Sequence, residues 1–160
     1  AGCASVAMSK SFGVRFISRS RTLPPPSTSD VDAYFEPETD EILRAISRLK
    51  DQLDVNVELA SPLDFLPEVP GWRDRSRSRF VSGRLEVLDF DYYSQALSKL
   101  ERSFDLDLAD VEAMVATGRV EPRRLLELFE SIEPELFRFP AVEPTRLRRR
   151  LEKLVQSELE

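Results

Sequence analysis

The hydrophobic residues of this chain change their spacing near Tyr92. Before that point, short segments alternate apolar and polar residues, and residues 54–59 alternate strictly, as in a β-strand with one buried face. After it, apolar residues recur every three to four positions, as in amphipathic helices. Strands interleaved with one helix and then followed by a run of helices predict a small α/β or α+β domain.

The predicted elements follow from these two periods. Strands are expected over residues 30–35, 54–59 and 85–90, a helix over 42–53, and further helices whose apolar stripes begin at Tyr93, Leu108, Leu125 and Leu147. Pro122 and Pro144 suit the first turns of the last two helices. Residues 61–80 hold three prolines and a glycine, which predicts a loop or lid.

Four arginines alternate within that predicted loop, at positions 73, 75, 77 and 79. A guanidinium group can fork onto phosphate oxygens, so such a run can line a groove for an anionic substrate. The alternative is a solvated edge. The sequence leaves both readings open.

Composition limits the possible classes of protein. The chain has 160 residues, of which 41% are hydrophobic, and this is enough for one compact domain. No apolar run approaches the length of a membrane span, so a cytoplasmic protein is expected. The formal charge of -6 argues against general DNA binding. Cys3 is the only cysteine and histidine is absent, which excludes an intrachain disulfide, imidazole catalysis and histidine-bearing zinc sites.

The chain is expected to have three parts. Residues 1–26 form a basic lead-in that ends in three prolines, a stiff spacer that stops a helix from continuing. Residues 27–91 hold the predicted strands, and residues 92–160 hold the helices that pack on them.

Three carboxylates on two predicted strands form a candidate metal site. Asp30 and Asp32 would project from one face of a strand, roughly 6.6 Å apart along it. Glu58, on a neighbouring strand, would complete the set if it lies on the same side. Carboxylate oxygens are the ligands that Mg²⁺ prefers. The alternatives are a solvated acidic turn for the aspartates and an ordinary exposed strand face for the glutamate.

The helix after the last strand carries a second polar group. Lys99 and Arg102 share a helix face with Gln95, and Asp107 and Asp110 follow them. The two cations could hold phosphate oxygens while the two acids orient them. The alternative is a surface ion-pair network, which contributes little to stability.

Three blocks, in this order, resemble bacterial nucleotidyltransferase-like proteins that are related to abortive-infection toxins, within the polymerase-beta-type nucleotidyltransferase superfamily. The blocks are S-T-S-D-V-D-A-Y-F-E-P-E, V-N-V-E-L-A-S-P-L-D-F-L-P-E-V-P-G-W and Y-Y-S-Q-A-L-S-K-L-E-R, and the resemblance covers about residues 27–155. It implies an α+β fold: the small mixed sheet of a minimal nucleotidyltransferase core, followed by a C-terminal helical half.

The resemblance also implies an activity, which is metal-dependent nucleotidyl transfer from a nucleoside triphosphate to an acceptor hydroxyl. It makes Asp30, Asp32 and Glu58 the catalytic carboxylates and the ligands of a two-metal Mg²⁺ site. The residues it assigns to nucleotide binding are Gly2, Cys3, Ser29, Lys99 and Arg102, with Asp107 and Asp110 behind them. A role as the toxin of a toxin–antitoxin pair, with an antitoxin protein or an RNA acceptor as partner, would follow.

The chain departs from the superfamily pattern upstream of Asp30. Members place a strand and a Gly-Gly or Gly-Ser turn there, so that backbone N–H groups cradle the phosphates. Here the matching pair is Gly2-Cys3, at a longer spacing. The alternative function is therefore a catalytically inactive module that keeps the fold and binds a protein partner.

Overall fold

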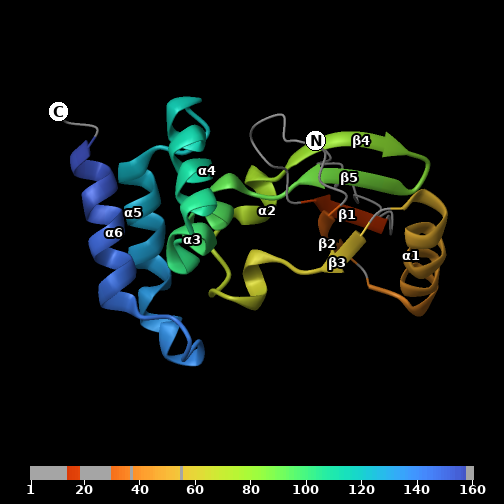
Figure 1. Cartoon of the computed structure of the whole chain (residues 1–160), viewed down its shortest axis with the longest axis horizontal. Coiled ribbons are helices and arrows are strands. Elements are labelled where there is room, and N and C mark those ends of the chain that lie inside the picture. The colour runs from red at the N-terminus through yellow and green to blue at the C-terminus, as the bar shows by residue number, and fades with distance from the viewer. Residues whose placement is uncertain (1–13, 19–29, 37, 55, 158–160) are drawn as a thin grey trace, which may run out of the picture.

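The computed structural model describes residues 14–18, 30–36, 38–54 and 56–157. A mixed β-sheet lies at one end of the molecule and a bundle of helices at the other, as Figure 1 shows. This arrangement confirms the predicted α+β class. The predicted division into three parts stays a prediction.

The sheet of the described residues has five strands. They are β1 (Val14–Ser18), β2 (Asp30–Glu36), β3 (Asn56–Leu59), β4 (Arg77–Ser82) and β5 (Leu85–Asp89), and their order across the sheet is β3-β2-β1-β5-β4. The pairs β2–β3 and β1–β5 are parallel, whereas β1–β2 and β4–β5 are antiparallel. The sheet is therefore mixed, as the resemblance implied.

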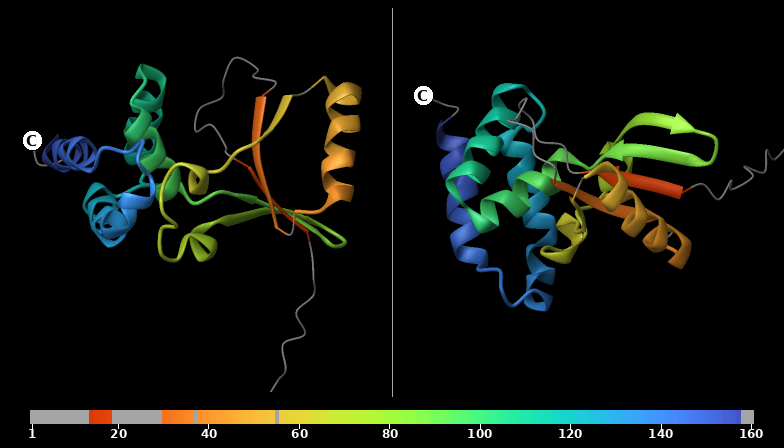
Figure 2. Two further views of the ribbon diagram at one scale, coloured as in Figure 1. Left: turned by 90° about the horizontal axis from the view of Figure 1, so that it is seen from below. Right: turned by 45° about the vertical axis from the view of Figure 1, so that its right-hand side comes forward.

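Helix α1 (Asp40–Leu53) connects the parallel strands β2 and β3 and stands at the end of the molecule away from the helical half (Figures 1 and 2). Its N-cap is Thr39, whose hydroxyl accepts the N–H of Ile42. It ends where Asp54 adopts a left-handed conformation (φ 51°) and donates its N–H to the carbonyl of Lys50. This helix end corrects the predicted strand over 54–59, which begins at Asn56.

The prediction of a loop over residues 61–80 is wrong for much of the segment. A short 3₁₀ helix, η1 (Pro62–Asp64), and helix α2 (Trp72–Arg75) precede strand β4. The strand forms because it pairs with β5 in a hairpin, turning at Gly83 (φ 57°), a conformation that glycine adopts without strain. Every residue of β4 is exposed, so the sequence shows no alternation that would reveal it.

The helical half carries most of the buried apolar core. It comprises α3 (Tyr92–Arg102), α4 (Asp105–Ala116), α5 (Pro122–Ile132), the 3₁₀ helix η2 (Glu133–Arg138) and α6 (Pro144–Ser157). Leu97, Leu125, Phe129 and Leu151 are completely buried among these helices. The predicted stripes and both proline starts are confirmed. Among the described residues, none of the helices has the length and apolarity that crossing a membrane requires.

The sheet meets the helices at the end of β5, which Phe90 and Asp91 connect to α3. There the rings of Trp72 and Phe90 stack with their centroids 4.7 Å apart, and Tyr34 of β2 contacts Trp72 edge-on at 6.1 Å. Leu88 completes this small second core. These contacts fix α2 against both the sheet and the start of α3.

Candidate functional site

The candidate carboxylates lie on the paired strands β2 and β3. Asp32 is opposite Glu58 in the strand register, and Asp30 is opposite Asn56. Directly paired residues of neighbouring strands point to the same side of a sheet. Asp32 is half-buried and Glu58 is exposed, and the amide of Asn56 donates a hydrogen bond of 3.2 Å to the Glu58 carboxylate. Asp32 and Glu58 thus share one row, with Asn56 holding the glutamate.

Asn56 was not among the predicted site residues. The signal for it was present in the strict alternation of residues 54–59, which places Asn56 on the polar face beside Glu58. Its amide can both orient a carboxylate and offer an oxygen to a cation.

The complete set of three carboxylates stays a prediction. Only the backbone of Asp30 is described, and Gly2, Cys3 and Ser29 lie outside the described residues. Among the side chains that the structure describes, no group of three acidic, cysteine or histidine residues could hold a metal ion. The chemistry of the donor set nevertheless fits Mg²⁺, because the paired strands bring together carboxylate and amide oxygens.

The topology places Asp32 and Glu58 near the same end of the strands at which β5 leaves the sheet toward α3. Strand β2 is antiparallel to β1, and β1 is parallel to β5. The N-terminal ends of β2 and β3 therefore lie on the same side of the sheet as the C-terminal end of β5. In the register, Ser18 of β1 is paired with both Ala33 of β2 and Asp89 of β5. The backbone positions of Asp32 and of the β5 exit are therefore separated by one strand.

Lys99 and Arg102 bind the two acids that follow them. The Lys99 ammonium lies 3.3 Å from Asp107 and 2.5 Å from Asp110, and Arg102 donates to Asp107 at 2.7 Å. Lys99 and Asp107 are only 7% and 6% exposed. The alternative of a surface ion-pair network is therefore wrong, because the charges at its centre, Lys99 and Asp107, are buried between α3 and α4.

This buried group leaves one cation partly at the surface. Lys99 binds both carboxylates, whereas the Arg102 side chain is 34% exposed and its bond to Asp107 uses one of five N–H donors. The geometry can therefore position the Arg102 guanidinium for an anion. Lys99 already has two carboxylate partners, and removal of either acid would leave its charge less well matched.

Two further buried acids, Asp89 and Asp91, were not predicted from the sequence. Asp89 ends β5 and is 4% exposed, and Asp91 is 1% exposed. Arg79 lies 2.5 Å from Asp89. Two guanidinium nitrogens of Arg75 donate to the two carboxylate oxygens of Asp91, each at 2.9 Å. The signal was a second D-x-D, Asp89-Phe90-Asp91, at the end of a strand.

Asp91 also starts the helix that carries Lys99. Its carboxylate accepts the backbone N–H groups of Tyr93 and Ser94, which makes it the N-cap of α3. Arg75 additionally donates to the carbonyl of Pro70 at 2.7 Å and lies over the ring of Tyr93. The pair of Arg75 and Asp91 therefore fastens α2 to the beginning of α3.

These contacts correct the two readings of the alternating arginines. Arg75 and Arg79 bind buried acids of the chain itself, and Arg73 pairs with Glu68 and, at 3.5 Å, with Glu36. The run is thus mainly an internal set of ion pairs. It forms neither an anion groove nor a wholly solvated edge.

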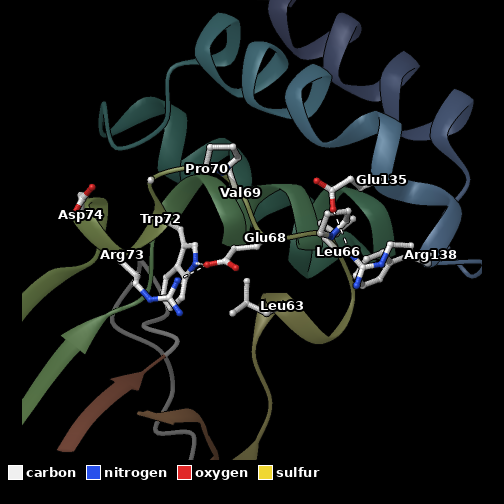
Figure 3. Close-up of a pocket in the computed structure, with 13 residues that line it drawn as sticks. Leu63, Leu66, Glu68, Val69, Pro70, Trp72, Arg73, Asp74, Glu135 and Arg138 are labelled. Carbon is white, nitrogen blue, oxygen red and sulfur yellow. Dashed lines mark hydrogen bonds and ion pairs between the residues drawn. The ribbon is translucent and has the colours of Figure 1, made fainter. Parts of the chain in front are cut away.

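A cleft of about 680 Å³ opens beside α2 (Figure 3). One wall is formed by Leu63 and residues 66–74 and the other by Glu135, Arg138 and Phe139. The indole N–H of Trp72 donates to Glu68 at 2.5 Å and holds the pKa of that carboxyl below its usual value. Sequence reasoning missed this cleft, because its two walls are far apart along the chain.

Comparison with known proteins identifies the family. Residues 23–139 match the sequence pattern of a family described as a nucleotidyltransferase of unknown function (DUF6036). No curated protein and no solved structure matches the chain. The family name implies nucleotidyltransferase activity, whereas the link to abortive-infection toxins rests on the resemblance alone. Because the match covers most of its length, the chain belongs to the DUF6036 family of nucleotidyltransferases.

Proposed function

We propose that this chain transfers a nucleotidyl group from a nucleoside triphosphate to an acceptor hydroxyl. Membership of the family implies a nucleotide substrate. The observation that supports the proposal most is the register of β2 and β3, in which Asp32 is opposite Glu58 and Asp30 lies two residues earlier. The three acids then lie on two adjacent strands at one edge of the sheet.

In this proposal Asp30, Asp32 and Glu58 hold Mg²⁺ through their carboxylate oxygens. Bound there, the metal would neutralise phosphate charge and lower the pKa of the acceptor hydroxyl. Glu58, held by Asn56, accepts the proton that the acceptor hydroxyl loses. The residues contribute mainly by positioning and charge stabilisation.

The cations of α3 act on the phosphates. Arg102, with its exposed part, contacts the leaving pyrophosphate, and Lys99 adds positive charge behind it. Asp107 and Asp110 hold these two side chains in place. Gly2, Cys3 and Ser29 are assigned to the phosphates by the resemblance only.

The second candidate is a catalytically inactive module that binds a protein partner. One observation favours it: the Lys99 ammonium is buried and already bound by two carboxylates, so its charge is matched without any nucleotide. A role as a toxin, with an antitoxin protein or an RNA acceptor, also stays a proposal.

Thermal unfolding of the full chain with Mg²⁺ and each nucleoside triphosphate tests the proposal. A ligand at 100 times its Kd should raise the melting temperature by about 5–10 °C, since binding to the folded state stabilises it. The shift should vanish in Asp32→Asn and persist in Glu41→Gln, a matched control on the exposed side of α1. Transfer of an α-phosphate label should follow the same pattern.

Two results would contradict the proposal. One is the absence of a shift with all four nucleoside triphosphates, which would favour the inactive module. The other is an equal shift in wild type and Asp32→Asn, which would place the nucleotide away from β2.

A further inference from the structure

Three arginines from the two halves of the molecule meet where β5 ends, at Asp89. Arg79 of β4 binds the Asp89 carboxylate at 2.5 Å, and Arg77 is paired with Asp89 in the register of β4 and β5. The third is Arg119, in the turn after α4, which donates to the hydroxyl of Tyr92 at 3.3 Å. That hydroxyl donates at 3.4 Å to the same Asp89 oxygen that Arg79 binds. The alternating run forms no anion groove by itself, but here it gains a guanidinium from the helical half.

Positive charge is in excess at this point. Among the described side chains, Asp89 is the one acid that these arginines contact, and it is only 4% exposed. Asp91, the next acid along the chain, is already bound to α2 through both oxygens, and Asp74 lines the cleft beside α2. If the exposed Glu121, which follows the turn after α4, is counted as well, three arginines still face two acids.

The position of Arg79 is fixed by an irregularity in the pairing of β4. Ser78 and Phe80 are paired with consecutive residues of β5, which leaves Arg79 as an extra residue between them. A bulge of this kind redirects a side chain, and bulges are frequent beside functional sites. Here the redirected side chain binds the buried Asp89.

The position of Arg119 is fixed by the turn that carries it. Gly118 adopts a left-handed conformation (φ 67°), and the Arg119 N–H donates to the carbonyl of Met114 at 2.9 Å. The guanidinium carbon of Arg119 lies 5.1 Å from the centre of the Tyr92 ring, within the range of a cation–π contact. Groups that are held in advance lose little conformational freedom when a ligand binds.

The three arginines keep hydrogen-bond donors for a ligand. A guanidinium has five N–H groups. Arg79 binds Asp89 through Nε and its side chain is 56% exposed, and the half-buried Arg119 binds Tyr92 through one Nη. Arg77 is exposed, and within the described part of the chain it has no ionic or hydrogen-bond partner. Phosphate oxygens accept charge-assisted bonds from several guanidinium groups at once.

The register places this cluster on the face of the sheet opposite the candidate carboxylates. Ser18 is paired with both Ala33 and Asp89, and directly paired residues project from the same face. Ala33 directly follows Asp32 in β2, so Asp89 and Asp32 project from opposite faces. The cluster is therefore separate from the site of the proposed nucleotidyl transfer.

We propose that Arg77, Arg79 and Arg119 form a second site, which binds a phosphate group. Arg79 and Arg119 donate to its oxygens from the two halves of the molecule, and Arg77 adds positive charge from the edge strand. Asp89 and Tyr92 hold the arginines and do not contact the ligand. The binding needs neither Mg²⁺ nor the three carboxylates of β2 and β3, so it is independent of the proposed nucleotidyl transfer.

The test uses the full chain in EDTA, so that no Mg²⁺ can hold a phosphate at β2 and β3. Calorimetric titration compares two sources of phosphate: inorganic pyrophosphate and a short single-stranded RNA. Binding should be saturable, with one site per chain, and should weaken as salt rises. The probe that binds more tightly identifies whether the site takes a free phosphate or the backbone of a nucleic acid.

Variants locate the binding. The double change Arg77→Gln and Arg119→Gln should weaken binding of the tighter probe by about threefold to thirtyfold, from the loss of two partly exposed charges. Arg79 is kept, because a buried acid depends on it. The control Arg48→Gln and Arg149→Gln removes the same net charge from exposed positions of α1 and α6 and should bind as wild type does.

A second measurement locates the site in the unchanged chain. Phenylglyoxal modifies accessible arginines, and mass spectrometry reads the extent at each position. The bound probe should protect Arg77 and Arg119 but not Arg48 or Arg149, so the result does not depend on whether the double variant folds.

Any of three results would overturn the inference: no binding of either probe without Mg²⁺, equal weakening by the double variant and its control, or no protection of Arg77 and Arg119. Asp32→Asn should bind the probe in EDTA as wild type does. Loss of the nucleotide response in this variant, with the binding in EDTA intact, would separate the two proposals.

Discussion

The two ends of this molecule differ in how they use their apolar residues. In the helical half, the stripes of α3, α5 and α6 are buried against one another, and Phe129 is completely inaccessible. In the sheet half, α1 has an apolar stripe and yet contains no buried residue, and Leu49 is 46% exposed. Stability therefore resides mainly in the helices, whereas the proposed carboxylate chemistry resides on the sheet.

The largest expected effect tests this contrast directly. Phe129→Ala in the helical core should lower the free energy of unfolding by about 3–5 kcal/mol, because it leaves a cavity. Leu49→Ala, on the exposed stripe of α1, should cost less than about 1 kcal/mol. Urea unfolding followed by circular dichroism measures both. Similar losses in the two variants would show that α1 is packed after all.

Removing a buried charge should lower stability more than removing an exposed one. Lys99→Met leaves Asp107 and Asp110 without their shared ammonium and should cost about 3 kcal/mol. The control is Arg124→Met, which breaks an exposed pair with Glu127 and should cost less than about 0.5 kcal/mol. Thermal unfolding compares them. An equal, small effect would mean that the group between α3 and α4 is not held together by this lysine.

A substitution at the junction between the two halves should have an intermediate effect on stability. Arg75→Lys keeps the charge but loses the fork onto Asp91, so a cost of about 1–2 kcal/mol is expected. Hydrogen exchange at the amides of Tyr93 and Ser94, which Asp91 caps, should speed up. Arg138→Lys, in an exposed pair, is the control and should change neither.

The smallest expected effect concerns pH. The Trp72 N–H holds the pKa of Glu68 below its usual value in the folded state. At pH values above the unfolded-state pKa, this difference stabilises the folded protein. That contribution is lost as pH falls through the folded-state pKa. Glu68→Gln should therefore lose less stability on acidification, by under about 0.5 kcal/mol for this exposed group. Urea unfolding at neutral and acid pH measures it, and a larger loss in the variant would contradict it.

The elements with a buried face could be predicted from the sequence. Helices α5 and α6 were predicted from a proline at the start and an apolar stripe. Strand β3 was predicted from its alternation, although none of its residues is buried and Leu59 is 49% exposed. Strand β4 could not be found, because all its residues are exposed and only pairing with β5 makes it a strand. Both edge strands lack buried residues, but the sequence of β3 alternates apolar and polar residues whereas that of β4 does not.

The polar sites were predictable in part. The alternation of residues 54–59 and the order of the three resembling blocks predicted Glu58 on a strand beside that of Asp32, and the register has the two residues opposite each other. The sequence could not indicate that Lys99 is buried, since a lysine followed by two acids looks the same on a surface. Nor could it join Glu68 to Glu135 across one cleft, because that proximity arises only from tertiary packing.

Only Phe90 and Asp91 separate β5 from α3, and the first helical turns then fix how far Lys99 lies from the helix start. Lys99 lies seven residues after Tyr92, so the helix rise places its backbone about 10 Å along the axis from the start of α3. Inserting one residue into this interval would turn the ammonium by about 100° around the helix axis. In the proposed nucleotidyl transfer, this fixed interval along α3 would set how far the Lys99 charge lies from the strand ends that carry the carboxylates.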